Sequence, residues 1–101
     1  MIYSIAVLAP EPLDPTAAKR LIQQILKSGS VTPSQHALDQ LKAREMTMVD
    51  VANVLRGGYV DGSEEVNRTW RYRIRTAHMV VVIAFRSESE LRIVTGWRVG
   101  R

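Results

Sequence analysis

The hydrophobic residues of this 101-residue chain change their spacing near residue 59, from the period of a helix to the period of a strand. Before that point, three segments carry an apolar stripe at helical spacing and polar residues elsewhere. We expect helices over residues 15–29, 33–44 and 47–57, with capping signals at Asp14, Thr32 and the Thr47-Met-Val-Asp segment. The residues predicted to face inward are Ala18, Leu21, Ile22, Ile25, Leu26, Ala37, Leu38, Leu41, Met48, Val51, Ala52 and Leu55.

The second half of the chain has the alternation that is typical of strands. The expected elements are strands over 67–76, 79–86 and 91–99, tight turns at 77–78 and 87–90, and a polar turn at 61–65. The middle strand is apolar at every position from Met79 to Phe85. A strand of that composition is covered on both faces, so we expect it at the centre of an antiparallel meander.

These elements predict an α+β domain of two layers, in which N-terminal helices pack on a C-terminal antiparallel β-meander. A chain of 101 residues is long enough for one core and too short for two, so we expect a single domain. It divides into an N-terminal strand and link (1–14), a helical part (15–58) and a sheet (59–101). The strand, at the β-prone residues 2–8, is expected to form an extra sheet edge or a contact in a homodimer.

Residues 68–75 read Arg-Thr-Trp-Arg-Tyr-Arg-Ile-Arg, and this alternation suggests a binding surface. In a strand, Arg71, Arg73 and Arg75 lie on one face, and the aromatic and branched residues between them lie on the other. Parallel arginines repel one another unless negative charge lies beside them, and a phosphodiester chain or an acidic protein supplies that charge. The same pattern is equally typical of the solvated face of an antiparallel sheet.

The charge of the chain is concentrated in its C-terminal part. The net charge is +4, yet residues 66–101 alone carry eight arginines against Glu88 and Glu90. Every basic residue of that part is an arginine, which favours planar, bidentate contacts with phosphate or carboxylate groups. A genomic preference for arginine over lysine produces the same composition.

Composition and motifs exclude several kinds of site. The chain has no cysteine, which excludes disulfides and thiolate metal sites. It has no nucleotide-binding glycine loop and no H-E-x-x-H or G-x-S-x-G motif, and its two histidines lack a cluster of carboxylates. We therefore expect no metal and no cofactor. The first residues lack a basic region and are too short to span a bilayer, so we expect a cytoplasmic protein without membrane insertion.

A second candidate cluster consists of His36, Gln40 and Arg44, which a spacing of four residues places in one row on a helix. Histidine, tyrosine and arginine together support phosphodiester cleavage without a metal. An RNA strand is cut by its own 2′-hydroxyl when a protein supplies a base, a proton for the leaving oxygen and cations for the phosphate. The predicted catalytic residues are His36, Tyr72 and Arg73, with His36 as the base or acid because unperturbed histidine titrates near ~6.5.

The predicted RNA-binding residues are Arg44, Arg71, Arg75, Trp97 and Arg98, and Trp70 or Trp97 is expected to stack on an unpaired base. Each assignment has a structural alternative. His36 can cap its helix, Arg44 can interact with the helix dipole, and tryptophans in strands more often pack in a core. Tyr72 has the opposite parity to the arginines, so they share a face only if a bulge re-aims one of them.

Four segments carry a resemblance to a known family. They are Ser34-Gln-His-Ala-Leu-Asp-Gln-Leu-Lys-Ala-Arg44, Met46-Thr-Met-Val-Asp-Val-Ala-Asn-Val-Leu-Arg-Gly-Gly58, Trp70-Arg-Tyr-Arg73 and Ile93-Val-Thr-Gly-Trp97. Together they resemble a small bacterial domain family of uncharacterised type with the pattern HAxxRMxxR. Residues 17–31 also resemble the opening helix and Gly-x-Val link of the motility quorum-sensing regulator toxin. The resemblance extends over residues 17–98.

The resemblance implies a RelE-like toxin, which packs helices on an antiparallel sheet and cleaves messenger RNA without a metal. It implies two partners: RNA, free or on the ribosome, and a cognate antitoxin with an acidic contact surface. The chain matches the pattern at His36, Ala37 and Arg44, but Gln40 stands in place of the usual arginine and Leu41 in place of methionine. If that arginine binds phosphate in relatives, its replacement counts against activity here.

Three hypotheses follow from the residues and the resemblance. The leading one is the toxin of a toxin-antitoxin pair, acting on messenger RNA as a metal-independent endoribonuclease. The second is a non-catalytic module whose basic sheet face binds nucleic acid or an acidic protein, with salt-sensitive affinity and no turnover. The third is an inactive relative of such toxins.

Overall fold

The computed structural model describes residues 10–100, which form three helices and five strands. The elements are α2 (Pro15–Ser28), β1 (Ser30–Pro33), α3 (Gln35–Ala43), α4 (Met48–Gly57), β2 (Tyr59–Val66), β3 (Thr69–Arg75), β4 (Met79–Ser87) and β5 (Glu90–Arg98). This arrangement confirms the predicted α+β class, with helices that precede and pack on a β-meander. The strand predicted at residues 2–8 lies outside the described residues.

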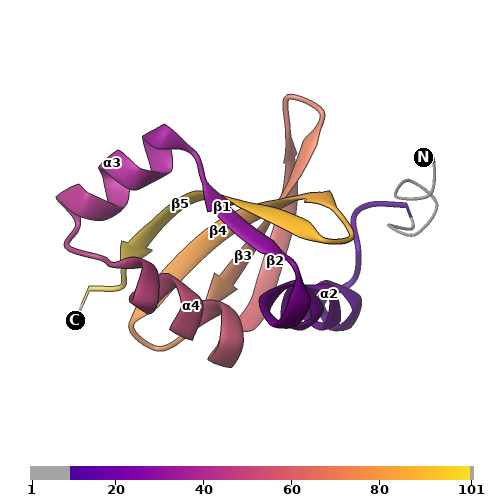
Figure 1. Cartoon of the computed structure of the whole chain (residues 1–101), viewed down its shortest axis with the longest axis horizontal. Helices are drawn as coiled ribbons and strands as arrows, with labels where there is room; N and C mark the ends of the chain where they lie inside the picture. The colour runs from indigo at the N-terminus through magenta and orange to yellow at the C-terminus, as the bar shows by residue number, and fades with distance from the viewer. Residues whose placement is uncertain (1–9, 101) are drawn as a thin grey trace.

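The sheet has the strand order β1-β5-β4-β3-β2, so the apolar β4 is the central strand, as predicted (Figure 1). Strands β2 to β5 are antiparallel to their neighbours, and β1 runs parallel to β5. The sheet is therefore mixed at one edge. In the described part of the chain, no helix combines the length and the apolar composition needed to cross a membrane.

Local capping interactions explain where the helices begin. The Asp14 side chain accepts a hydrogen bond from the backbone of Ala17 at 2.7 Å, and Thr47 forms the predicted capping box with Asp50. The second helix begins two residues later than predicted, with Ser34 as its N-cap, because Pro33 is the last residue of β1. Three helix starts are thus fixed by short polar side chains that precede an apolar stripe.

Strand β2 corrects the prediction of a polar turn at residues 61–65. The turn lies instead at Asn67 and Arg68, whose φ angles are 51° and 67°. A two-residue loop with positive φ at both positions is a type I′ turn, which suits the twist of a hairpin. The prediction failed because β2 is an edge strand that is exposed along most of its length, so it has no apolar alternation.

Strand β1 was also missed by the sequence interpretation, which assigned residues 30–32 to no helix or strand and began the second helix at Pro33. Its four residues pair with the start of β5, where Val31 lies opposite Leu91. A Cβ at Gly29 would collide with the carbonyl oxygen of Ser89, so only glycine permits this close approach. A four-residue strand is too short to show a period of its own.

The core lies between the sheet and the helices α2 and α4, which cover one face (Figure 1). Tyr72 and Ile74 of β3 contribute to it together with apolar residues from all three helices. Leu38 and Met48 were predicted to face inward, but both are exposed, at 39% and 38%. The reason is that α3 and α4 each bury fewer of their apolar side chains than their sequences suggest.

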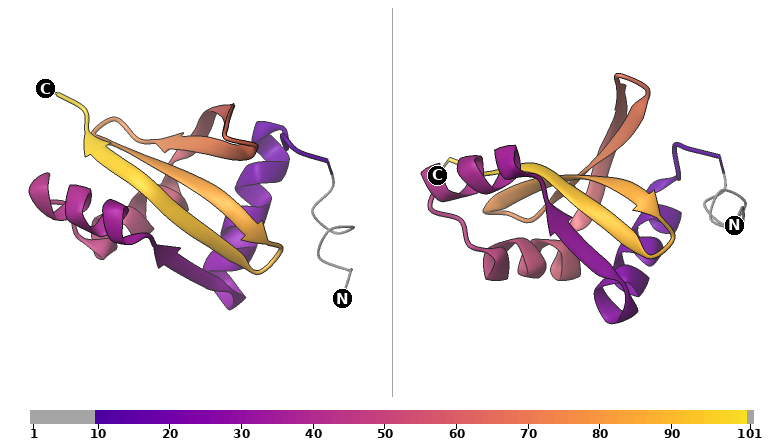
Figure 2. Two further views of the ribbon diagram at one scale, coloured as in Figure 1. Left: turned by 90° about the horizontal axis from the view of Figure 1, so that it is seen from above. Right: turned by 45° about the horizontal axis from the view of Figure 1, so that its top comes forward.

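The face of the sheet turned away from α2 and α4 is called the open face below. The hairpin of β2 and β3 rises from this side of the molecule, whereas α2 and α4 lie below the sheet (Figure 2). Helix α3 lies beside β5 and buries only Ala37 and Leu41. Its polar side is therefore left next to the open face.

Candidate functional site between helix α3 and the sheet

The alternation of β3 divides its side chains between the two faces of the sheet, as the sequence predicts. Tyr72 and Ile74 are completely buried in the core. Arg71, Arg73 and Arg75 are half-buried on the opposite, open face. The arginines therefore share one surface, and Tyr72 does not belong to it.

A β-bulge in β5 brings two consecutive residues to the same open face. Thr95 lies opposite Val82 and Ile93 lies opposite Ile83, so Val94 is an extra residue with no partner in β4. A bulge interrupts the alternation of a strand and re-aims a side chain. As a result, Val94 and Thr95 both face the groove described next, although Ile93 before them is buried in the core.

A groove of about 490 Å³ runs between α3 and the open face of the sheet, and we call it the α3 groove. Its lining residues are His36, Gln40, Arg44, Arg71, Val94, Thr95 and Trp97. The fold thus unites the polar row of the helix with one arginine of β3 and one tryptophan of β5, which the sequence interpretation treated as separate clusters. None of the lining residues is acidic, and among residues 10–100 no three His, Asp or Glu side chains gather in a group suited to a metal ion.

A hydrogen-bond network fixes the helix side of the α3 groove to β5. Arg44 Nη1 donates to the carbonyl oxygen of Gly96 at 2.8 Å, to Thr95 Oγ1 at 3.2 Å and to Gln40 Oε1 at 3.4 Å. The Thr95 hydroxyl in turn donates to Gln40 Oε1. Sequence reasoning found the helical row but missed Thr95, because a bulge leaves no mark in the spacing of apolar residues.

Arg71 forms the sheet side of the α3 groove. Its Nε is buried and has no hydrogen-bond partner among the described residues. Its neighbour across the ladder is Glu64 of β2, but their side chains form no ion pair in the described part of the chain. A buried charged donor without an acceptor is costly, so a hydrogen-bond acceptor brought to this atom would stabilise Arg71.

A second, smaller groove of about 200 Å³ continues the first toward the β2–β3 hairpin, and we call it the hairpin groove. It shares four residues with the α3 groove, namely Arg71, Val94, Thr95 and Trp97. Arg73 and Val82 extend it along the sheet, and Glu64 adds a carboxylate. The half-buried Trp97 therefore stands where the two grooves meet.

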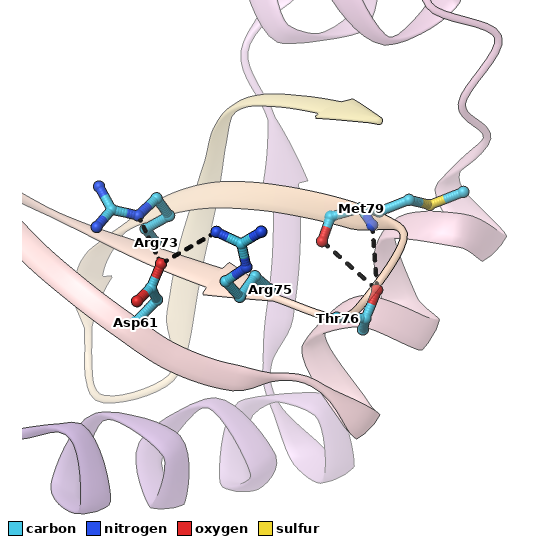
Figure 3. Close-up of polar contacts among 5 residues, drawn as sticks. All are labelled: Asp61, Arg73, Arg75, Thr76 and Met79. Carbon is cyan, nitrogen blue, oxygen red and sulfur yellow. Dashed lines mark hydrogen bonds and ion pairs between the residues drawn. The ribbon is translucent and has the colours of Figure 1, made fainter. Parts of the chain in front are cut away.

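Arg73 and Arg75 already have an anionic partner within the protein. The Asp61 carboxylate lies between them, 3.1 Å from Arg73 Nε and 3.4 Å from Arg75 Nη1 (Figure 3). Asp61 is the extra residue of a bulge in β2. The hydrogen bond from Arg73 lowers the pKa of Asp61 below its usual value. Of the three arginines of β3, only Arg71 lines the α3 groove.

Tyr72 is held on the core face by the segment that precedes α2. Its hydroxyl donates to Glu11 Oε2 at 2.8 Å and accepts from the backbone N–H of Leu13 at 3.0 Å. Burial raises the pKa of this hydroxyl well above its usual value. The structure therefore separates Tyr72 from His36 and the arginines, which argues against the predicted catalytic role and assigns it to the core.

Arg98, predicted to bind RNA, also lies away from the α3 groove. It donates to the carbonyl oxygen of Glu45 at 2.8 Å and lies 3.9 Å from the Asp50 carboxylate. Alternation along β5 explains this placement, because Arg98 points to the opposite side from Trp97. Its contacts join the loop after α3 to the end of the sheet, which is a structural role.

Comparisons with family models, with curated protein sequences and with solved structures gave no match to this chain. The residues and the geometry of the two grooves are therefore the basis for assigning a function. The likeness to RelE-like toxins stays an expectation from the sequence pattern.

We expect Tyr72→Phe to lower the free energy of unfolding by about 1–3 kcal/mol, because Glu11 and the Leu13 N–H lose their buried partner.

The raised pKa of Tyr72 also makes the stability of the fold depend on pH. A neutral Tyr72 stabilises the fold below the ordinary tyrosine pKa near ~10, and this contribution is lost as the pH rises above it. Denaturant titrations at neutral and alkaline pH measure the free energy of unfolding. Its decrease between the two pH values should be smaller in the variant than in the wild type. An unchanged stability would contradict the core role.

Proposed function

We propose that this chain binds single-stranded RNA along its open face, with the phosphate backbone in the α3 groove. The observation that carries the proposal is the junction of Arg44 and Arg71 across one groove that has no acidic lining residue. Two guanidinium groups on opposite walls repel each other unless an anion lies between them. A phosphodiester supplies this charge together with oxygens that accept the arginine N–H groups.

Trp97 favours a single strand over a duplex as the ligand. It stands between the α3 groove and the hairpin groove, beside Val94 and within reach of a base attached to a phosphate near Arg71. Unpaired bases stack on aromatic side chains, whereas the bases of a duplex are already stacked on one another. The combination of arginines and one half-buried aromatic side chain supports binding with little dependence on sequence.

We expect Arg71→Gln to weaken the binding of a single-stranded RNA about tenfold, because the charged donor of the groove is lost. The slope of log affinity against log salt should also decrease by about one. Arg56→Gln is the matched control, since Arg56 is an exposed arginine of α4 that contacts Asn53 of its own helix. Fluorescence anisotropy over a salt series measures both quantities. An equal loss of RNA affinity in the two variants would contradict binding at the α3 groove. It would indicate that affinity depends only on the net charge of the protein.

We expect the opposite effect from Asp61→Asn. The Asp61 carboxylate pairs with Arg73 and Arg75, so it competes with phosphate for these side chains. Removing its charge should raise RNA affinity by up to about fivefold, the scale of an exposed ion pair. The gain should shrink as salt is added. A decrease in affinity on the same anisotropy assay would show that Asp61 orders the arginines for binding instead of competing with the ligand.

A second candidate function is cleavage of the bound RNA, which the position of His36 favours. His36 lies on the exposed start of α3 and lines the same groove as Arg44 and Arg71. In this proposal the 2′-oxygen attacks the phosphorus and the 5′-oxygen leaves. His36 takes the proton of the 2′-hydroxyl or protonates the leaving oxygen, water exchanges the other proton, and the arginines stabilise charge on the phosphate. The chain would then act as a toxin on messenger RNA in the cytoplasm. It would require an antitoxin with an acidic surface that covers the open face.

Cleavage predicts discrete fragments that end in a 2′,3′-cyclic phosphate when the protein is incubated with a long single-stranded RNA in excess EDTA. His36→Gln should reduce the rate at least about a hundredfold while RNA binding persists, because general acid–base catalysis contributes that much. His78→Gln is the control, since His78 is exposed in the β3–β4 turn. Intact RNA with salt-sensitive binding, both with and without ribosomes, would favour the non-catalytic module.

A further inference from the structure

The side-chain amide of Gln40 has a fixed orientation in the wall of the α3 groove. Its Oε1 lies 3.4 Å from Arg44 Nη1 and also accepts from the Thr95 hydroxyl. A guanidinium group has donors and no acceptor, so the amide atom that faces it must be the oxygen. The contact with Arg44 therefore decides the amide orientation, which the contact with a hydroxyl alone leaves open.

Thr95 reinforces this orientation. Its Oγ1 accepts from Arg44 Nη1 at 3.2 Å, which leaves its own proton for Gln40 Oε1. Arg44 is held in turn by the Gly96 carbonyl oxygen at 2.8 Å. The hydrogen bonds run in one direction, from Arg44 through Thr95 to Gln40. The Gln40 amide oxygen is thus used within the protein, and its NH₂ group is left to bind something else.

We infer that the Gln40 NH₂ group is a ligand for the phosphate of bound RNA, and that Thr95 is a positioning residue that holds it in place. The inference rests on the proposed function, because it names the group that the α3 groove recognises. Among residues 10–100, the Gln40 NH₂ group has no hydrogen-bond partner, and it shares the groove with the guanidinium groups of Arg44 and Arg71. A base edge presents both donors and acceptors, whereas phosphate oxygens are acceptors only. A wall rich in free donors therefore fits a phosphate best.

The test combines binding with a direct observation of the amide. Titration of ¹⁵N-labelled protein with inorganic phosphate, and separately with a single-stranded oligouridine, should shift the side-chain NH₂ resonances of Gln40. The exposed Gln24 of α2 serves as an internal reference and should not shift. This measurement uses the unmodified chain, so it does not depend on how any variant folds.

Variants separate the donor role of Gln40 from its structural role. Gln40→Glu keeps acceptors for Thr95 and Arg44, so the network and the thermal stability should persist, but it replaces two donors with a negative charge. We expect RNA affinity to fall at least about tenfold. Gln24→Glu, with the same change of charge on α2, should leave affinity within about twofold of the wild type at moderate salt.

Substitutions at Thr95 test the positioning role. Thr95→Val has nearly the same shape but lacks the hydroxyl, so only the 3.4 Å contact with Arg44 still holds the amide. Affinity should fall about threefold, a typical effect of one neutral hydrogen bond. Thr95→Ser retains the hydroxyl and should restore binding. If both variants bind as weakly as each other, the hydroxyl does not position the amide and this part of the inference fails.

Two further outcomes distinguish this inference from the proposed function. If Arg71→Gln loses RNA affinity while Gln40→Glu binds as the wild type does, the groove binds RNA but Gln40 is not a ligand. If the wild type binds no RNA, the proposed function fails. The RNA part of the inference then fails with it, and the phosphate titration decides the rest: a shift of the Gln40 NH₂ resonances supports a phosphate site at Gln40, and no shift overturns it.

Discussion

The close contact between α3 and β5 is the constraint on which the candidate site depends. Leu41 packs against Gly96, where a Cβ would lie only 3.1 Å from Leu41 Cδ2 and 3.2 Å from the Val80 carbonyl oxygen. A larger residue at this position would force the Leu41 side chain or the strand to shift by a few tenths of an ångström. Because the helix lies so close, Arg44 reaches the backbone carbonyl of Gly96 and the hydroxyl of Thr95. An apolar contact on one side of α3 thus sets the geometry of the polar row on its other side.

The sheet contributes to the same surface through one regular strand and one irregular strand. In β3, strict alternation buries Tyr72 and leaves Arg71 on the open face. In β5, alternation alone would have given Val94 and Thr95 opposite faces, but the bulge at Val94 brings both to the groove. The regular strand supplies the charge, and the irregular strand supplies the hydroxyl that orients its neighbours across the groove.

The sequence was sufficient for most of the fold because helices and buried strands carry strong periodic signals. The capping residues Asp14 and Thr47 and the apolar β4 were identified correctly for that reason. Strand β2 was missed because an exposed edge strand buries too little to impose alternation, and β1 because four residues show no period. The polar row of α3 and the sheet residues Arg71 and Trp97 were predicted separately, and Val94 and Thr95 were missed. These residues come together because α3 packs on β5 and because β5 has a bulge. Neither feature changes the spacing of apolar residues, so the sequence pattern does not predict it.

The distribution of charge gives a reason for placing the ligand at the α3 groove and not along the whole arginine row. Arg73 and Arg75 share the carboxylate of Asp61, so an anion that binds them must compete with a partner already in place. Arg71 has no such partner among the described residues, so an anion that binds it displaces no carboxylate. Gln40, which departs from the arginine of the family-like pattern, adds donors at this point without adding repulsion to Arg44 and Arg71. A neutral donor beside Arg44, in the groove that Arg71 also lines, is therefore compatible with the binding of a single phosphate.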